Sequence, residues 1–325
     1  MRSRRMTPLF TLPAIFLLAG CLGGSDAAAA GKLETTTVTV DAFAAIDSAG
    51  LFIAQMDGLF AKQGLTVKIN LAQSTQDEIN AQVGGTYDVS LGDYVTYIDN
   101  DVLAKKQLLI TGESSFLQPN VLTLLVKKNN AAVGTIGSLR GKEVSVNAKN
   151  DIGTLLIDSL MIEHGVSLNQ FNFNNDVAFP QVATALMSGT VSASFAPEPF
   201  VSIYEAKIGA EELADLDQGA TANFPIQGVA VTRQFAQKDP NTLKAFMTAV
   251  NQGQEIADTS RPKVEKALEK FLDLPQEFAS LVSLPTFPTS VNPIRLQRVV
   301  DAMVRFKFLP TSDSNFQITS MIWNG

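Results

Sequence analysis

Strand and helix patterns alternate over residues 35–91, and this alternation constrains the fold most. Residues 35–43 alternate polar and apolar side chains as a strand does, and residues 49–62 carry apolar side chains at helical spacing. Residues 66–71, 75–83 and 87–91 then predict a strand, a helix and a strand. A β-α-β-α-β order needs right-handed crossovers, so it predicts an α/β fold with a mainly parallel sheet.

The same pattern starts again after Ser138. Residues 142–147, 171–173 and 191–195 predict strands, and residues 153–164 and 180–188 predict helices between them. Residues 85–92 (GTYDVSLG) are echoed by residues 189–196 (GTVSASFA), and in both places a predicted helix ends at glycine before a strand begins. Two α/β lobes built from one kind of unit are therefore expected.

The remaining segments predict how the two lobes are joined. Strands at 108–111 and 121–127 extend the first lobe, and a strand after Gly228 returns the chain to it. Helices predicted at 241–257, 262–271, 276–282 and 294–306 would pack on the first lobe. The chain would cross between lobes near 126–130 and 224–230, which makes a two-crossing hinge. Lobe 1 would comprise residues 35–127 and 228–325, and lobe 2 residues 128–227.

The first 20 residues have the layout of a signal peptide. Three arginines stand within the first five residues, and the apolar stretch at 9–18 is too short to span a bilayer. Residues 18–21 (LAGC) resemble the lipobox of bacterial lipoproteins, in which the thiol of Cys21 receives a diacylglycerol. We expect a lipid anchor at Cys21, a flexible tether over 21–34 and an extracytoplasmic, membrane-anchored protein. The alternative is a free or buried cysteine in an ordinary secretory signal.

Composition narrows the possible chemistry and partners. The chain has 25 basic and 32 acidic side chains, a balance that argues against nucleic acid as a partner. Cys21 is the only cysteine and His164 the only histidine, so neither a disulfide nor a His/Cys metal cluster is expected. We predict no metal, no cofactor and no catalytic residue. We also expect the protein to act as a monomer.

Several motifs together resemble one known family. They are residues 51–67 (LFIAQMDGLFAKQGLTV), 85–89 (GTYDV), 139–144 (LRGKEV), 188–191 (SGTV) and 198–200 (EPF). Over about residues 36–250 the chain resembles the solute-binding proteins of ABC importers for nitrate, aliphatic sulfonates, taurine and the thiamine pyrimidine precursor. Ser192 departs from the pattern, because the family usually has aspartate there. The resemblance implies a periplasmic-binding-protein type II fold, a small solute trapped between the lobes, an ABC permease as partner and no catalysis.

Candidate ligand-binding residues follow from a rule of open α/β sheets, whose ligands lie beyond the carboxyl ends of the strands. The loops at those ends hold Asp47, Ser48, Asp93, Tyr94, Glu113, Ser114 and Ser115 in the first lobe and Asn150, Asp151, Gly153, Thr154, Phe179 and Glu198 in the second. The helix starts at Ser48 and Gly153 would also offer backbone N–H groups to an anion.

The charges of these loops indicate a class of ligand. Five of the candidates are acids, no arginine lies in the loops, and Lys149 is the nearby cation. An amine, a zwitterion such as taurine or a nitrogen heterocycle is therefore favoured over nitrate or a bare sulfonate. Asp47 and Asp151 have an alternative role as helix caps. Glu198 is the strongest candidate because two prolines flank it, and its alternative is a solvent-facing turn acid.

Three further alternatives stay open at this point. Tyr94 and Phe179 would either stack on a planar ligand or belong to the core. The same fold also serves enzymes that act on pyrimidine or menaquinone-type precursors. A sensory lipoprotein that binds a protein partner is the third possibility.

Overall fold

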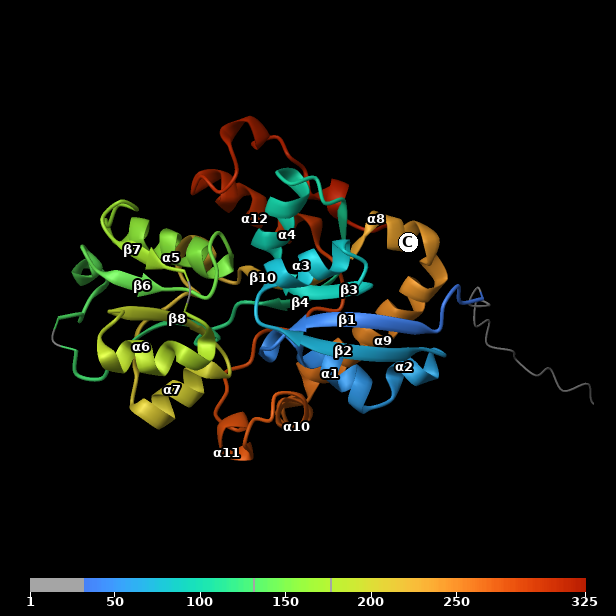
Figure 1. Ribbon diagram of the computed structural model, residues 1–325, viewed down its shortest axis with the longest axis horizontal. Helices are drawn as coiled ribbons and strands as arrows, with labels where there is room; N and C mark the ends of the chain where they lie inside the picture. Colours follow the sequence, from blue (N-terminus) through green and yellow to red (C-terminus); the bar gives the residue numbers. More distant parts are fainter. Residues whose placement is uncertain (1–31, 131, 176) are drawn as a thin grey trace, which may run out of the picture. The chain divides into compact units, whose positions relative to one another are not determined.

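The computed structural model describes residues 32–130, 132–175 and 177–325. The predicted signal peptide, the lipidation site Cys21 and most of the predicted tether lie outside these residues. Two five-stranded sheets form the core of the described chain (Figure 1). The first sheet has the order β2 (Thr66–Ala72), β1 (Thr37–Phe43), β3 (Val89–Asp93), β10 (Pro225–Thr232) and β4 (Leu108–Phe116). The second has the order β7 (Asn172–Asn174), β6 (Glu143–Ser145), β8 (Ala193–Pro197), β5 (Leu122–Val126) and β9 (Glu211–Asp215).

The two sheets share one pattern of strand directions. In the first sheet β1 pairs in parallel with β2 and β3, and β10 runs antiparallel to β3 and β4. In the second sheet β6 pairs in parallel with β7 and β8, and β5 runs antiparallel to β8 and β9. The predicted fold class of two α/β lobes is confirmed, and the GTYDVSLG and GTVSASFA segments lead into β3 and β8, which hold equivalent places.

The strand predicted at 121–127 is assigned to the wrong lobe by the sequence pattern. All five residues of β5 are buried and the strand pairs with β8 and β9, so it belongs to the second sheet. A strand that is apolar on both faces suits the middle of either sheet, and its composition does not select one. The first crossing therefore lies at 117–121 and not at 126–130, and the second lies at 216–224 and not at 224–230, most of which belongs to β10. The two crossing segments touch, since the Leu117 N–H donates to the Phe224 carbonyl at 2.8 Å.

Helices cover both sheets. Around the first sheet lie α1 (Ala49–Met56), α2 (Leu59–Lys62), α3 (Thr75–Val83) and α4 (Tyr94–Val102). In Figure 1, α5 (Ile152–Glu163) lies above the second sheet, with α6 (Val182–Ser188) and α7 (Phe200–Ile208) below it. The helix predicted over 49–62 is divided into α1 and α2 by Gly58, whose φ of 68° is left-handed.

The C-terminal helices pack on the first lobe, as the sequence predicts. They are α8 (Arg233–Lys238), α9 (Pro240–Thr259), α10 (Arg261–Phe271), α11 (Gln276–Ala279) and α12 (Pro293–Arg305). Helices α9 and α10 pack against α1, and α12 packs against α4 and β10. Within the described part of the chain, no helix has the length and apolar character needed to cross a membrane.

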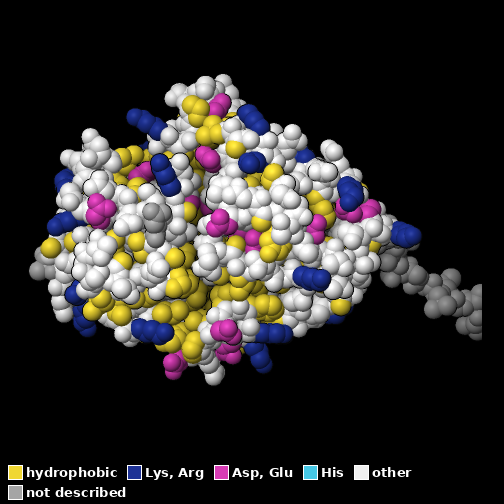
Figure 2. Space-filling view, viewed as in Figure 1, with side chains coloured by type: hydrophobic (Ala, Val, Ile, Leu, Met, Phe, Trp, Pro, Cys, Tyr) yellow, Lys and Arg dark blue, Asp and Glu magenta, His cyan; other side chains and the backbone are white. Residues whose placement is uncertain are grey.

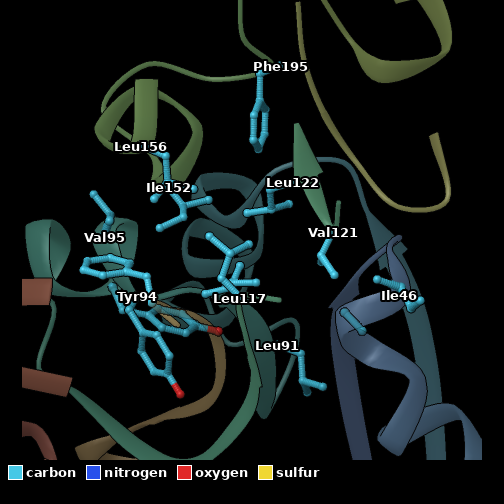
Figure 3. Close-up of a cluster of buried hydrophobic side chains, with 14 of the residues drawn as sticks. Ile46, Leu91, Tyr94, Val95, Leu117, Val121, Leu122, Ile152, Leu156 and Phe195 are labelled. Atoms are coloured by element: carbon cyan, nitrogen blue, oxygen red, sulfur yellow. The ribbon is translucent and has the colours of Figure 1, made fainter. Parts of the chain in front are cut away.

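The hydrophobic core continues through the first crossing. Figure 3 shows Leu91 of β3, Leu117 and Val121 of the crossing, and Ile152 and Phe195 of the second lobe among the buried side chains of one cluster. Each of these residues is at most 7 % exposed. The crossing is therefore a packed part of the molecule and fixes where the strand ends of the two lobes meet.

Close packing of α1 on α9 gives a test of the first lobe. A Cβ atom at Gly253 would lie 2.1 Å from the Gly50 carbonyl oxygen, so Gly253→Ala must push the two helices apart. We expect a loss of about 1–3 kcal/mol in the free energy of unfolding, measured with urea. Gly134→Ala is the control because a Cβ there meets nothing within 4 Å, and it should change stability by less than about 0.5 kcal/mol. Equal effects of the two substitutions would contradict this packing.

Candidate functional site

A cavity of about 630 Å³ lies between the two lobes. Its walls come from the carboxyl ends of β1, β2, β3, β6, β7 and β8, where the rule for open α/β sheets places a ligand. The first lobe contributes Phe43, Asp47, residues 74–77, Asp93, Thr96, Asp99, Ile226 and Gln227. The second contributes Leu122, residues 147–152, Asn175, Phe195 and Pro197. In Figure 2, acidic side chains, drawn in magenta, gather near the middle of the visible face.

Four predicted residues line this cavity, and two of them do so while capping a helix. Asp93 accepts hydrogen bonds from the Thr96 N–H at 2.9 Å and the Thr96 hydroxyl at 2.8 Å, at the start of α4. Asp151 accepts from the Thr154 N–H at 3.0 Å, at the start of α5. Capping and lining the cleft are therefore compatible roles, because an N-terminal cap at a strand end faces the same edge as the ligand. The other two lining residues are Asp47 and Asn150.

Asp47 is held by the first lobe without capping a helix. It is 2 % exposed, and its carboxylate accepts a hydrogen bond from the Ser115 hydroxyl. Burial raises the pKa of Asp47 to about 6. Ser115 does not line the cavity, so its role is to orient a residue that does.

Asp93 and Asp151 line the cavity from opposite lobes, and their carboxylates interact electrostatically. Burial, followed by the negative charge of Asp93, raises the pKa of Asp151 to about 7. Burial also raises the pKa of Asp93, and hydrogen bonds from Thr96, Thr75 and the Ile152 N–H oppose that rise. Lys149 is the only cationic side chain among the lining residues, and it is exposed. Neither carboxylate forms an ion pair with a described residue.

Three amide side chains at the cavity complete a set of hydrogen-bond acceptors. The Oδ1 atoms of Asn147 and Asn175 and the Oε1 atom of Gln227 are buried and have no partner among the described residues. Buried polar atoms are normally hydrogen-bonded, so three unpaired oxygens in one cavity indicate a place for donor groups of a ligand. Asn147 is the last residue of one predicted strand and Asn175 follows another, so the strand-end rule would have found them, as it would residues 74–77. Gln227 lies inside a strand and carries no such signal.

Part of the cavity wall is apolar. It is formed by Phe43, Leu122, Phe195, Pro197 and Ile226. Phe179, a predicted ligand contact, lies behind this wall. Its ring centroid is 6.1 Å from those of both Phe43 and Phe195, so it supports the wall and does not line the cavity.

Eight further predicted residues do not line the cavity: Ser48, Tyr94, Glu113, Ser114, Ser115, Gly153, Thr154 and Glu198. The Ser48 hydroxyl donates to the Phe43 carbonyl at 2.8 Å, and the Ser114 carbonyl accepts from Gln254 at 2.7 Å. Gly153 lies against the Phe195 ring. The Thr154 N–H donates the hydrogen bond that the Asp151 carboxylate accepts as the N-cap of α5. Tyr94 is fully buried beside Gly228, where a Cβ atom would lie 2.5 Å from its ring.

Two predicted acids are satisfied by partners that the local sequence does not reveal. The Glu113 carboxylate forms an ion pair with Arg295 of α12, with Oε2 to Nε at 2.8 Å. The strand-end loops contain no arginine, yet Glu113 has an arginine partner, because Arg295 comes from a distant segment of the chain. Glu198 is 1 % exposed and accepts from the Ser202 hydroxyl at 2.8 Å and the Ser283 N–H at 2.9 Å. The geometry gives no support to a solvent-facing turn at Glu198.

The raised pKa of Asp151 predicts how the stability of the unliganded protein depends on pH. The folded state holds the proton up to about pH 7, whereas an unfolded aspartate loses it near pH 4, so stability falls as pH rises through this window. Asp151→Asn keeps an N-cap but removes the charge. We expect it to stabilise the protein at pH 8 by about 1 kcal/mol or more, and by less at pH 5.

Urea unfolding at pH 5 and pH 8 measures this effect. Asp273→Asn, at an exposed acid with a left-handed φ of 50° that asparagine tolerates, is the control and should show no such pH dependence. A stabilisation by Asp151→Asn that is equal at both pH values would rule out the assigned cause.

Comparisons with known proteins agree with this geometry. The family model described as NMT1/THI5 like matches residues 45–262. The fold is similar to the alkanesulfonate-binding protein SsuA of Xanthomonas axonopodis pv. citri bound to MOPS, with a TM-score of 0.75, 16% identity and coverage of 90% of this chain and 99% of that one. The periplasmic nitrate-binding protein NrtA of Synechocystis gives a TM-score of 0.75 at 16% identity, with 89% and 86% covered.

The periplasmic aliphatic sulphonate-binding protein SsuA of Escherichia coli is also similar, with a TM-score of 0.71 at 17% identity and 89% and 92% covered. No curated protein sequence matches the chain. The family match covers well over half of the chain, and these structures share its two-lobed fold. The chain belongs to the NMT1/THI5-like family.

Proposed function

We propose that the protein is the extracytoplasmic solute-binding receptor of an ABC importer. It traps a small organic solute that carries N–H donors between its lobes and performs no chemistry on it. The observation that carries this proposal is the set of acceptors in the cleft, where Asp93, Asp151 and three unpaired amide oxygens converge. Family membership and the two-lobed fold support the class of receptor.

The acceptor set favours an amine over an anion. Carboxylates and amide oxygens accept hydrogen bonds, and an ammonium group supplies three donors and the missing positive charge. A nitrate or sulfonate would instead lie near the three buried carboxylates of Asp47, Asp93 and Asp151, with the exposed Lys149 as the only cation among the described residues of the cavity wall. The cleft is therefore acidic, whereas a site for an anion such as nitrate or a sulfonate would be expected to carry positive charge.

The apolar wall suits the carbon skeleton of the same solute. Phe43 and Phe195 would contact a flat or aliphatic body while the polar wall holds its nitrogen atoms. The cavity of about 630 Å³ has the size of sites that enclose small organic molecules. An amine, a zwitterion such as taurine and a nitrogen heterocycle such as a thiamine pyrimidine precursor all meet these requirements.

Two further parts of the proposal complete the receptor. A permease in the membrane would recognise the closed form, in which solute bridges the two lobes across the hinge. A lipid at Cys21 would keep a monomeric receptor at the membrane surface, and this part rests on sequence outside the described residues. An enzyme acting on a pyrimidine or menaquinone-type precursor, and a sensory lipoprotein, are the alternatives that the test below separates.

A ligand panel tests the proposal directly. Calorimetry at pH 8 with primary amines, aminopyrimidines, taurine, alkylsulfonates and nitrate should find saturable binding for a solute with N–H donors. Asp93→Asn keeps an N-cap for α4 and removes one cleft charge, so affinity for a cationic solute should fall about tenfold or more, or about 1.4 kcal/mol. Affinity should also rise from pH 6 to pH 8 as Asp151 ionises.

Asp273→Asn is the matched control and should leave affinity unchanged, since Asp273 is exposed and outside the cavity. Tightest binding of nitrate or an alkylsulfonate, strengthened by Asp93→Asn, would overturn the ligand class. Conversion of the bound solute, followed by mass spectrometry, would show an enzyme. Failure of every solute in the panel would favour the sensory alternative.

A further inference from the structure

A second cavity, of about 230 Å³, lies between α5 and the turn that follows α12. Thr154 and Asp158, one helical turn apart on α5, line one side, and residues 306–308 line the other. Helix α5 belongs to the second lobe, whereas α12 packs on α4 and β10 of the first. Both lobes therefore form the walls of this cavity, which we call the α5–α12 pocket.

Asp158 is the feature of this pocket that the fold does not explain. It is 8 % exposed, and no described residue donates a hydrogen bond or forms an ion pair with its carboxylate. It lies in the middle of α5, so it caps no helix, and it does not line the larger cleft. Burial raises the pKa of Asp158 to about 7. A buried carboxylate without partners is unfavourable, and a cationic group placed against it would remove that penalty.

The charges around Asp158 have a defined arrangement. Lys149 and Lys307 line the same pocket but are exposed, and neither forms an ion pair with Asp158. The pocket thus combines a buried negative group with two cations at its solvent side. Phe173 and Phe308 also line it and supply apolar surface. A molecule that satisfies both kinds of charge has an ammonium at one end and an acidic group at the other.

We propose that the α5–α12 pocket is a second binding site, which takes a small zwitterion with its ammonium against Asp158 and its acidic group toward Lys149 and Lys307. The volume is below the range of roughly 300–1,000 Å³ typical of drug-sized ligands, so a compact amino acid fits better than a larger solute. Because both lobes line the pocket, the bound zwitterion would favour the arrangement of lobes seen here. The two cavities share Lys149, Asn150 and Asn175 in their walls, whereas Asp158 and Lys307 line the α5–α12 pocket and not the cleft, so the proposed site does not depend on the ligand of the cleft.

Calorimetry with three matched probes tests the site. β-Alanine carries both charges, propylamine lacks the carboxylate and propionate lacks the ammonium group. We expect saturable binding of β-alanine that weakens about tenfold or more in Asp158→Asn and less in Lys307→Asn. Asparagine at 307 tolerates the left-handed φ of 68° there. Propylamine should bind more weakly than β-alanine, and its affinity should fall in Asp158→Asn but not in Lys307→Asn. Propionate should not bind.

Asp99→Asn separates this site from the cleft, because Asp99 lines only the larger cavity. We expect it to leave β-alanine binding unchanged. Loss of binding in Asp99→Asn but not in Asp158→Asn would place the zwitterion in the cleft and overturn the proposal. Absence of saturable binding by wild-type protein would also overturn it. Circular dichroism shows whether Asp158→Asn folds. If Asp158→Asn does not fold, the exposed-site variant Lys307→Asn decides: an unchanged affinity of Lys307→Asn for β-alanine would overturn the proposal.

Discussion

The pairing of β10 with both β3 and β4 is the constraint on which the first lobe depends. Without β10 the first sheet would split, because β3 and β4 have no direct ladder to each other. The same strand brings Gln227 opposite Asp93 and so places an amide oxygen at the cleft. Gly228, the next residue, leaves space for the buried Tyr94 ring. One strand thus completes a sheet, shapes the core and contributes to the site.

The cleft acquires its acidity from ordinary helix chemistry. Asp93 and Asp151 begin helices that start at strand ends, and aspartate is among the preferred residues at that position. Each carboxylate uses part of its hydrogen-bonding capacity on its own helix, and both remain at the cavity wall. Two such caps from opposite lobes raise the free energy of an empty closed cleft through charge repulsion. A cationic solute would reverse the sign of that interaction.

Much of the fold could be predicted because helix and strand periodicity is local, and four of the thirteen candidate ligand contacts line the cleft because strand ends share an edge. Longer-range pairings could not be predicted. The partner of Glu113 is Arg295, which lies 182 residues away in the sequence. The sequence pattern does not predict helix α4, since its tyrosine, valine, threonine and isoleucine residues have strand propensity, which tertiary packing overrides. Burial of Glu198 depends on Ser283, from another part of the chain.

The place of the crossings has a consequence for the order of assembly. Strands β5 to β9 are contiguous in sequence, from Leu122 to Asp215, so the second sheet contains every one of its strands once that segment is available. The first sheet begins at Thr37 but waits for β10, which starts at Pro225. Loop-closure entropy delays pairings of high sequence separation. The first lobe starts earlier in the chain, but it can be completed only after the second. Until β10 is available, the edge of β3 that pairs with β10 has no partner strand.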